Sequence, residues 1–307
     1  MEMRTIGSLE VSVVGLGTNN FGFRMQAEDV KPVVDAALDA GINFFDTSDS
    51  YADSEPRIAA ALADGNRRDG VVLATKFGTS LGADQPGRAT RDYIRGAVER
   101  SLTRLRTDRI DLYQIHQPHP ETPVAETLGA LDELVRQGKV REIGCSNFSA
   151  DQLDEAATAA GDGARFVSVQ NHFNLLHRAD EDTVIPACER LGVAYVPYFP
   201  LASGLLTGKY ERGTAPPEGT RLSAWGPRAE TLLSDENFDA VDRLTAWAAD
   251  HGHSLLDLAF AWLFATPTVA SVIAGATKPD QARANAATAG WTLTPAEKAE
   301  VDALLAG

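Results

Sequence analysis

Four side chains able to take part in proton transfer stand at or just past the C-terminal ends of apolar runs in this chain. They are a carboxylate, a phenol, an ammonium and an imidazole: Asp46, Tyr51, Lys76 and His116. The runs before them are consecutive and typical of parallel strands. In a barrel of alternating strands and helices, the carboxyl ends of the strands form the rim where chemistry takes place. The placement therefore predicts a proton-donating site at that rim.

Tyr51 is the expected proton donor. A free tyrosine titrates at about pH 10, so donation at neutral pH requires roughly 4 kcal/mol of preference for the phenolate. One ammonium about 4 Å away supplies an interaction of about that size at an effective dielectric constant of about 20. We assign this role to Lys76, with Asp46 as its counter-charge. His116 is expected to donate a hydrogen bond to a substrate carbonyl oxygen.

Alternating strand and helix signals follow a short N-terminal hairpin at residues 3–13. Apolar strand-like runs lie at residues 13–16, 42–45, 71–75, 110–115, 142–145, 166–169, 193–197 and 271–273. Amphipathic helical patterns lie at residues 30–40, 91–105, 125–137, 150–160, 184–191 and 239–251. This order predicts an α/β protein with a (β/α)8 TIM barrel, the hairpin, and extra helices near the C-terminus.

An open Rossmann sheet is the rival fold. It would place Gly-x-Gly-x-x-Gly directly after the first strand, at the start of a helix. Here Gly15, Gly17 and Gly22 have a different spacing, and polar turn residues follow them. The barrel is therefore favoured, as one domain over residues 1–307.

Composition restricts the partners. The formal net charge is −15, which argues against a nucleic acid or an anionic membrane surface as the main partner. The apolar stretch at 255–265 is too short to span a bilayer and is expected to be a buried helix. The two cysteines, Cys145 and Cys188, do not form a secreted disulfide framework, so a cytoplasmic location is expected. The irregular stretch at 203–234 follows the seventh strand, where barrels often bind phosphate groups.

Metal-dependent hydrolysis is a competing chemistry for a barrel. The close histidine pairs are His116 with His119 and His251 with His253. A metal site in a barrel needs several ligands converging on one ion. The second pair is expected at a helix end away from the rim, so we expect no metal.

Several segments together resemble the aldo-keto reductases. They are GINFFDTSDSY at 41–51, ATKFG at 74–78, LYQIH at 112–116, GCSNF at 144–148, YFPLASGLLTGKY at 198–210 and IAGATKPDQ at 273–281. They occur in family order over essentially the whole chain. The resemblance implies an NADPH-dependent oxidoreductase that reduces aldehydes and ketones, with NADH as the alternative cofactor. It assigns Tyr51 as proton donor, Lys76 and Asp46 as the pair that lowers its pKa, and His116 as the substrate-orienting residue.

The resemblance also implies how the cofactor is held. Positions corresponding to its binding residues are Gly17, Thr18, Ser146, Asn147, Gln170, Tyr198, Leu201, Ser203, Gly204, Leu206, Lys209, Arg221, Gly275, Thr277, Gln281 and Asn285. Among these, Tyr198 stacks on the nicotinamide and Arg221 meets the 2′-phosphate. Phe21, Phe77 and Trp225 are candidates for the substrate pocket wall.

A non-enzymatic function is the alternative implied by the same resemblance. Some members of the family partner with membrane channels, so the chain could be a weakly catalytic or non-catalytic NADP(H)-binding, redox-sensing subunit. The sequence marks no partner surface and leaves the oligomeric state open. The expected ligand is a small carbonyl compound.

Overall fold

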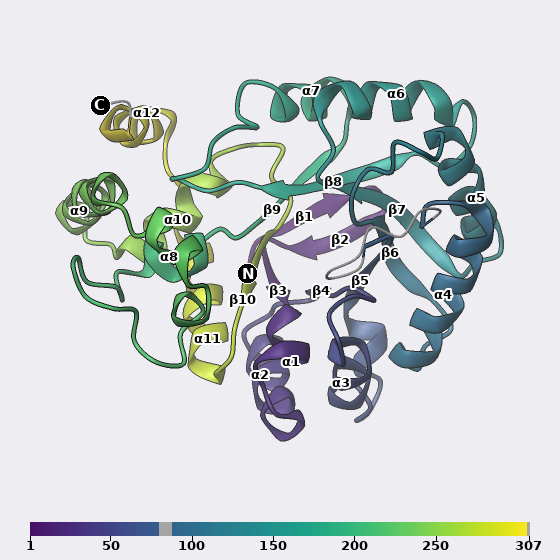
Figure 1. Ribbon diagram of the computed structural model, residues 1–307, viewed down its shortest axis with the longest axis horizontal. Helices are drawn as coiled ribbons and strands as arrows, with labels where there is room; N and C mark the ends of the chain where they lie inside the picture. Colours follow the sequence, from purple (N-terminus) through teal and green to yellow (C-terminus); the bar gives the residue numbers. More distant parts are fainter. Residues whose placement is uncertain (80–87, 306–307) are drawn as a thin grey trace.

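The centre of the molecule is a closed barrel of parallel strands (Figure 1). The computed structural model describes residues 1–79 and 88–305. Around the barrel the strand order is β10-β3-β4-β5-β6-β7-β8-β9. The barrel strands are β3 (Val14–Gly17), β4 (Phe44–Asp46), β5 (Val72–Phe77), β6 (Ile110–Ile115), β7 (Val140–Ser146), β8 (Phe166–His172), β9 (Ala194–Tyr198) and β10 (Val272–Gly275). The predicted (β/α)8 barrel is confirmed.

The strands form where the apolar runs predict them because both of their faces are covered. Every residue of β5 and β6 is buried, as expected for parallel strands between a barrel interior and a layer of helices. The run at 110–115 has the bounds of β6, whereas the other seven runs were predicted to end one to three residues too early. β7 continues through Ser146 and β8 through His172, so polar residues also occupy the carboxyl ends of the strands.

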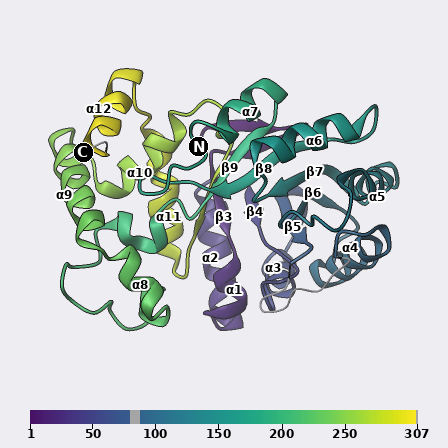
Figure 2. The same ribbon diagram turned by 45° about the horizontal axis from the view of Figure 1, so that its top comes forward.

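Helices surround the barrel and gather into a larger group at the C-terminal end of the chain (Figures 1 and 2). The helices around the first seven strands are α1 (Asn19–Phe23), α2 (Ala27–Asp39), α3 (Ser54–Ala61), α4 (Arg91–Leu105), α5 (Val124–Arg136), α6 (Ala150–Ala160) and α7 (Val184–Leu191). The later helices are α8 (Pro227–Leu232), α9 (Asp235–Asp250), α10 (Leu255–Phe264), α11 (Pro279–Ala287) and α12 (Pro295–Leu305). Short 3-10 turns are η1 (Arg67–Gly70), η2 (Ala202–Thr207), η3 (Leu222–Ala224) and η4 (Thr288–Gly290).

Local sequence explains several helix boundaries. Ser149 begins α6 with a reciprocal capping box to Gln152, and Gly192 ends α7 in the left-handed conformation. The predicted buried helix is α10, whose residues are mostly in the core. Within the described residues, no helix has the length and apolar character needed to cross a bilayer.

A β-hairpin closes the end of the barrel at which the strands begin. It consists of β1 (Met3–Ile6) and β2 (Leu9–Ser12), as predicted. Ile6, Leu9 and Val11 are buried and pack with residues of the barrel interior. The backbone N–H of Ser8 donates to Glu142 near the start of β7, at 2.8 Å. This end of the barrel is therefore filled by apolar side chains, which leaves the carboxyl ends of the strands as the open end.

Candidate active site

A buried ion pair lies at the floor of the open end. Nζ of Lys76 in β5 donates to Oδ2 of Asp46 in β4 at 2.5 Å and to the backbone oxygen of Thr47 at 2.9 Å. The other carboxylate oxygen of Asp46 accepts from Gln170 at 2.9 Å and from Gln114 at 3.3 Å. Burial is the largest single influence and disfavours the ammonium of Lys76, but Asp46 and Tyr51 together outweigh it, and the pKa of Lys76 is raised. The lysine therefore remains a cation inside the barrel.

Tyr51 lies directly beside this pair. Nζ of Lys76 is 5.2 Å from the centre of the Tyr51 ring, and the His116 ring meets the Tyr51 ring edge-on at 5.7 Å. The expected fall in the phenol's pKa is not what the structure gives. Burial raises the pKa of Tyr51, and the opposing effect of Lys76 is smaller. Asp46 also raises the pKa of Tyr51, because its negative charge disfavours a phenolate nearby.

The backbone of α1 holds the tyrosine loop in place. A side-chain carbon built on Gly22 would lie 1.8 Å from the backbone oxygen of Tyr51, inside van der Waals contact. Only a residue without a Cβ lets α1 approach the loop this closely. The position of Tyr51 therefore depends on a glycine in another element.

His116 is a neutral imidazole in this environment. Burial and the nearby charge of Lys76 lower the pKa of His116 to about 3. Its Nδ1 is 3.1 Å from Oγ of Ser48, and its backbone N–H donates to the oxygen of Phe77 at 2.8 Å. A neutral ring can donate one hydrogen bond without carrying a charge.

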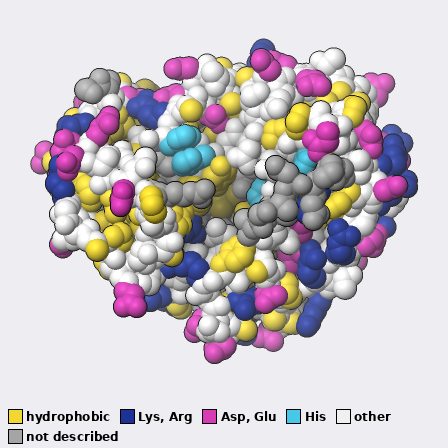
Figure 3. Space-filling model, in the orientation of Figure 1, with side chains coloured by type: hydrophobic (Ala, Val, Ile, Leu, Met, Phe, Trp, Pro, Cys, Tyr) yellow, Lys and Arg dark blue, Asp and Glu magenta, His cyan; other side chains and the backbone are white. Residues whose placement is uncertain are grey.

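A cavity of about 780 Å³ opens beside Tyr51 and His116. Figure 3 shows the corresponding face of the molecule hollowed near its centre, with histidine side chains beside the opening. The predicted site residues that line the cavity are Gly17, Thr18, Asp46, Tyr51, His116, Ser146, Asn147, Gln170, Tyr198, Leu201, Ser203, Gly204, Lys209, Arg221, Gly275, Thr277, Gln281 and Asn285. Residues predicted from separate segments of the chain are thus brought to one cavity.

Some sequence expectations are not met at this cavity. Lys76 lies beneath its surface, which agrees with a role exerted through Tyr51. Leu206 is fully buried in the hydrophobic core and does not line the cavity. Phe21 and Phe77 are also core residues, so they cannot form the pocket wall. Trp225 is partly buried and packs against Phe199, with ring centres 6.3 Å apart.

Polar groups at the middle of the cavity are fixed by one another. Oγ of Ser146 donates to the backbone oxygen of Gln170 at 2.6 Å. The side-chain amide of Asn147 donates to the backbone oxygen of His116 at 2.9 Å and accepts from the hydroxyl of Tyr198 at 2.9 Å. These bonds connect the ends of β6, β7, β8 and β9, so the aromatic face of Tyr198 has a defined position.

One part of the cavity wall is strongly cationic. Arg24, Lys209 and Arg221 line it, and none of them forms an ion pair with a carboxylate among the described residues. Arg221 instead donates to the side-chain oxygens of Asn19 and Asn20, at 2.9 and 3.0 Å. Burial and the neighbouring cations lower the pKa of both Lys209 and Arg221. Cations that repel one another in this way favour an anionic ligand.

Sequence reasoning missed several residues of the site. Gln114 could have been found, because it lies two positions before His116 and side chains alternate along a strand. Arg24, Asn19 and Asn20 lie in or beside the short helix α1 and carried no periodic signal. Ser48, which contacts His116, was missed for the same reason.

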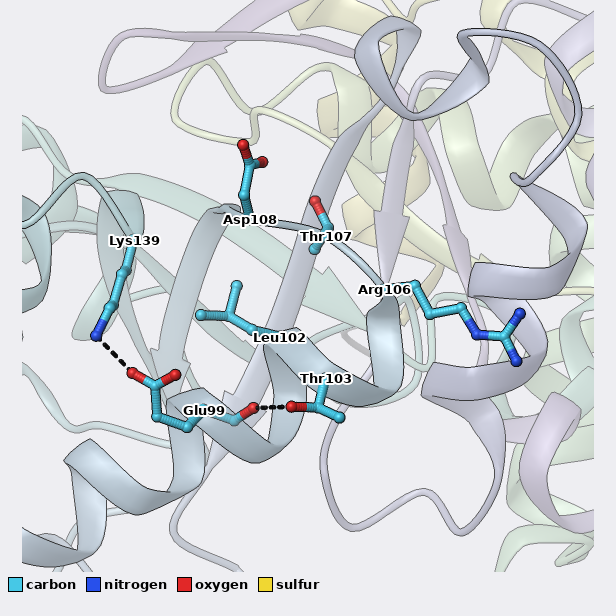
Figure 4. Close-up of a pocket in the computed structure, with 7 residues that line it drawn as sticks. All are labelled: Glu99, Leu102, Thr103, Arg106, Thr107, Asp108 and Lys139. Carbon is cyan, nitrogen blue, oxygen red and sulfur yellow. Dashed lines mark hydrogen bonds and ion pairs between the residues drawn. The ribbon is translucent and has the colours of Figure 1, made fainter.

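A second depression lies at the opposite end of the strands (Figure 4). It is lined by residues from the end of α4 to the start of β6, and by Lys139. Lys139 is paired with Glu99 at 2.5 Å, so its charge is already neutralised. This depression contains none of the predicted site residues. Among residues 1–79 and 88–305, no group of three or more histidine, cysteine or acidic side chains is arranged to hold a metal ion.

Comparison with known proteins agrees with this architecture. The sequence model of the Aldo/keto reductase family matches residues 13–306. The chain is 36% identical to "Aldo-keto reductase YhdN" of Bacillus subtilis (strain 168), over 97% of this chain and 91% of the relative. It is 34% identical to "Probable voltage-gated potassium channel subunit beta" of Oryza sativa subsp. japonica, over 92% and 89%. It is 33% identical to "Protein tas" of Escherichia coli (strain K12), over 97% and 95%. The chain therefore belongs to the Aldo/keto reductase family, a family of oxidoreductases.

Proposed function

We propose that this protein reduces aldehydes and ketones to alcohols with NADPH, and that Tyr51 donates the proton. The observation that carries the proposal is the buried Asp46–Lys76 pair beside the Tyr51 ring at the mouth of a large cavity. An ammonium beside a phenol stabilises the phenolate that remains after proton transfer. Lys76 has no exposed surface, and burying a charged side chain carries a desolvation cost, so its place beside Tyr51 supports a role in the chemistry.

The four rim residues then have separate tasks. Tyr51 donates its proton to the carbonyl oxygen of the substrate as negative charge develops there. Lys76 stabilises the resulting phenolate, and Asp46 keeps Lys76 charged. His116 donates a hydrogen bond to the same substrate oxygen and orients it. The nicotinamide, when bound, would supply the hydride; the protein supplies position and charge stabilisation.

The cavity wall fits a phosphorylated dinucleotide. The cationic wall formed by Arg24, Lys209 and Arg221 is suited to phosphate groups. Gly204 lies against Lys209, and a Cβ built there would be 2.4 Å from the lysine Nζ. The absence of a Cβ at position 204 therefore lets the Lys209 ammonium lie against this loop at the cavity wall. Tyr198 offers an aromatic face for the nicotinamide, and Ser146, Asn147 and Gln170 offer hydrogen bonds for its carboxamide. We therefore propose NADPH as the preferred cofactor over NADH.

The proposal is tested by following cofactor oxidation with a panel of aldehydes, ketones and sugars, with NADPH and NADH compared. Turnover of at least one carbonyl class is expected. The variant Tyr51→Phe should lose about 10³-fold in kcat, because it removes the general acid, while the Kd for NADPH changes by less than about threefold. Normal turnover by Tyr51→Phe would refute the assigned donor.

The names of two plant relatives support a second candidate function. The two, from Oryza sativa and Arabidopsis thaliana, are named as probable voltage-gated potassium channel beta subunits. By analogy, the chain could be an NADP(H)-binding, redox-sensing subunit that turns over slowly or not at all. Tight NADPH binding without turnover of any carbonyl in the panel would favour this second function. A cytoplasmic location is proposed for either function.

A further inference from the structure

Ser48 occupies a position that determines how His116 can form hydrogen bonds. The serine is fully buried in the loop between β4 and α3. Its Oγ lies 3.1 Å from Nδ1 of His116. Since Nδ1 faces the serine and His116 lines the cavity, Nε2 is the ring nitrogen available to a ligand. The contact joins two loops that belong to different strands.

A neutral imidazole carries one N–H, on either Nδ1 or Nε2. The nitrogen that holds it is decided by the hydrogen bond made by the other nitrogen. If Nδ1 accepts from Ser48, the N–H is on Nε2 and can donate to a substrate oxygen. If Nδ1 donates to Ser48, Nε2 can only accept, and it cannot stabilise negative charge on that oxygen. The direction of one hydrogen bond therefore decides whether His116 can perform its proposed task.

The surroundings of Ser48 provide donors for the lone pairs of its oxygen. The backbone N–H of Ser50 donates to Oγ of Ser48 at 3.2 Å, and Oγ of Ser50 lies 2.8 Å away. Either hydroxyl of this serine pair can be the donor. When Oγ of Ser50 donates, both lone pairs of the Ser48 oxygen are occupied, and the hydroxyl hydrogen of Ser48 is directed to another acceptor. The candidates are Nδ1 of His116 at 3.1 Å and a carboxylate oxygen of Asp49 at 3.4 Å. The imidazole is the nearer acceptor.

We propose that Ser48 is a positioning residue that donates its hydroxyl hydrogen to Nδ1 of His116 and so keeps the imidazole N–H on Nε2. The inference rests on the proposed carbonyl reduction, because it assigns His116 the role of a hydrogen-bond donor to the substrate. It extends that function to a chain of donors, Ser50 to Ser48 to His116 to substrate. The hydroxyl of Ser48 has no contact with the substrate itself in this arrangement.

The direct test is the tautomer of His116 in the unmodified protein. Histidine ring nitrogens are labelled with ¹⁵N, and the proton-coupled ring spectrum is recorded at neutral pH with no ligand added. Signals of His116 are identified as those missing from the His116→Gln variant. The expected result is a protonated Nε2 and an unprotonated Nδ1. A spectrum in which Nδ1 carries the proton, or in which both forms are equally populated, overturns the inference. This readout does not require enzymatic activity.

Variants then connect the tautomer to catalysis. Ser48→Ala should give a mixture of the two tautomers and lower kcat by about 10-fold, because the hydrogen bond that favours the Nε2–H form is lost. Ser48→Thr retains the hydroxyl and should restore both the Nε2–H form and kcat. Unchanged kcat with an unchanged tautomer in Ser48→Ala would also overturn the proposal.

A matched control removes a buried hydroxyl far from His116. Ser271→Ala deletes a fully buried hydroxyl that donates to the backbone of Ser12 at 2.8 Å, and it should leave the His116 tautomer and kcat unchanged. If the unmodified protein turns over no carbonyl, the proposed function fails while the tautomer measurement still stands. If it turns over carbonyls but His116 has the other tautomer, only the role of Ser48 fails.

Discussion

The two ends of the barrel are built from different kinds of side chain. At the end closed by the hairpin, Ile6, Leu9 and Val11 fill the space between strands with apolar atoms. At the open end, the corresponding depth is occupied by the Asp46–Lys76 ion pair and its amide partners. Burying charges has a desolvation cost that burying apolar atoms does not have. The closed end is therefore arranged for stability, and the open end for chemistry.

Backbone conformation shows the same division. Non-glycine residues with positive φ gather in the loops at the open end: Ala52, Asn147, Phe199, Ala202 and Ser203. Such conformations cost roughly 1–2 kcal/mol each for residues with a Cβ. Arg106 is the exception, and it ends helix α4. Backbone strain, which lowers stability, is therefore concentrated in the loops at the open end of the barrel, where the cavity lies.

The largest expected effect comes from breaking the ion pair at the open end. Lys76→Met should lower kcat by on the order of 10³-fold, because the phenolate of Tyr51 loses its stabilising charge. The Kd for NADPH should change by less than about threefold. Steady-state kinetics and fluorescence titration of NADPH measure the two quantities. Loss of cofactor binding in both Lys76→Met and Tyr51→Phe would contradict the division of tasks proposed for these residues.

The converse change at the closed end should affect stability alone. Ile6→Ala leaves a cavity among fully buried side chains and should reduce the free energy of unfolding by about 2–5 kcal/mol. Denaturant unfolding measures this loss, while kcat of the folded variant should stay within about twofold of the original. A large fall in kcat at a temperature where Ile6→Ala is fully folded would show that the two ends are not independent.

A moderate effect is expected at the cationic wall. Arg24→Ala should weaken NADPH binding by about 10-fold, since a hydrogen bond to a charged group contributes roughly 1.5–3 kcal/mol and two other cations remain. NADH should be affected less if Arg24 contacts the 2′-phosphate. Arg190→Ala is the matched control, because Arg190 is exposed and paired with Asp154 outside the cavity. Equal weakening by both variants would point to net charge rather than a specific contact.

The smallest effect is a dependence of stability on pH. Burial holds the pKa of folded His116 at about 3, whereas an unfolded histidine titrates at about 6.5. The stability linked to a neutral His116 is therefore fully present above about pH 6.5 and is lost as the pH falls toward the folded pKa. Between pH 7 and pH 4.5, the melting temperature of His116→Gln should therefore fall by about 2–4 °C less than that of the original protein.

Asp49 provides the control of opposite sign for this measurement. Burial raises the pKa of Asp49 to about 6, so the folded state binds a proton more readily than the unfolded chain as the pH falls below that value. Asp49→Asn should therefore make the acid-induced fall in melting temperature steeper. Parallel pH profiles for His116→Gln, Asp49→Asn and the original protein would refute both assignments.

The fold could be predicted from the sequence because each buried strand leaves a continuous apolar run. Most of the apolar runs, however, ended one to three residues before the strands that they predicted. β5 extends through Lys76 to Phe77, since pairing of parallel backbones continues whether or not a side chain is apolar. The helix α3 was not among the predicted helical patterns. Its alanine-rich sequence after Ser54 has high helix propensity and could have been recognised.

Residues of the candidate site could be predicted where their position follows from the end of a strand. They were missed where their position depends on contacts between distant parts of the chain. Asp46 and His116 depend on strand position alone. Arg24 reaches the backbone oxygen of Gly219, a residue 195 positions away, and no local pattern indicates such a contact. The pKa of Tyr51 could not be predicted either, because it depends on the balance between burial and the shared charge of Lys76 and Asp46.

The close contact between Gly22 and the Tyr51 loop has a consequence for engineering. Within α1, Phe23 is exposed and would accept varied side chains, whereas Asn20 and Phe21 are buried. At position 22, any added carbon must push the oxygen of Tyr51 away. A library that diversifies this helix should therefore return functional clones with many amino acids at position 23 and only glycine at position 22. Tyr51, the proposed proton donor, is thereby under a constraint that lies wholly outside its own segment.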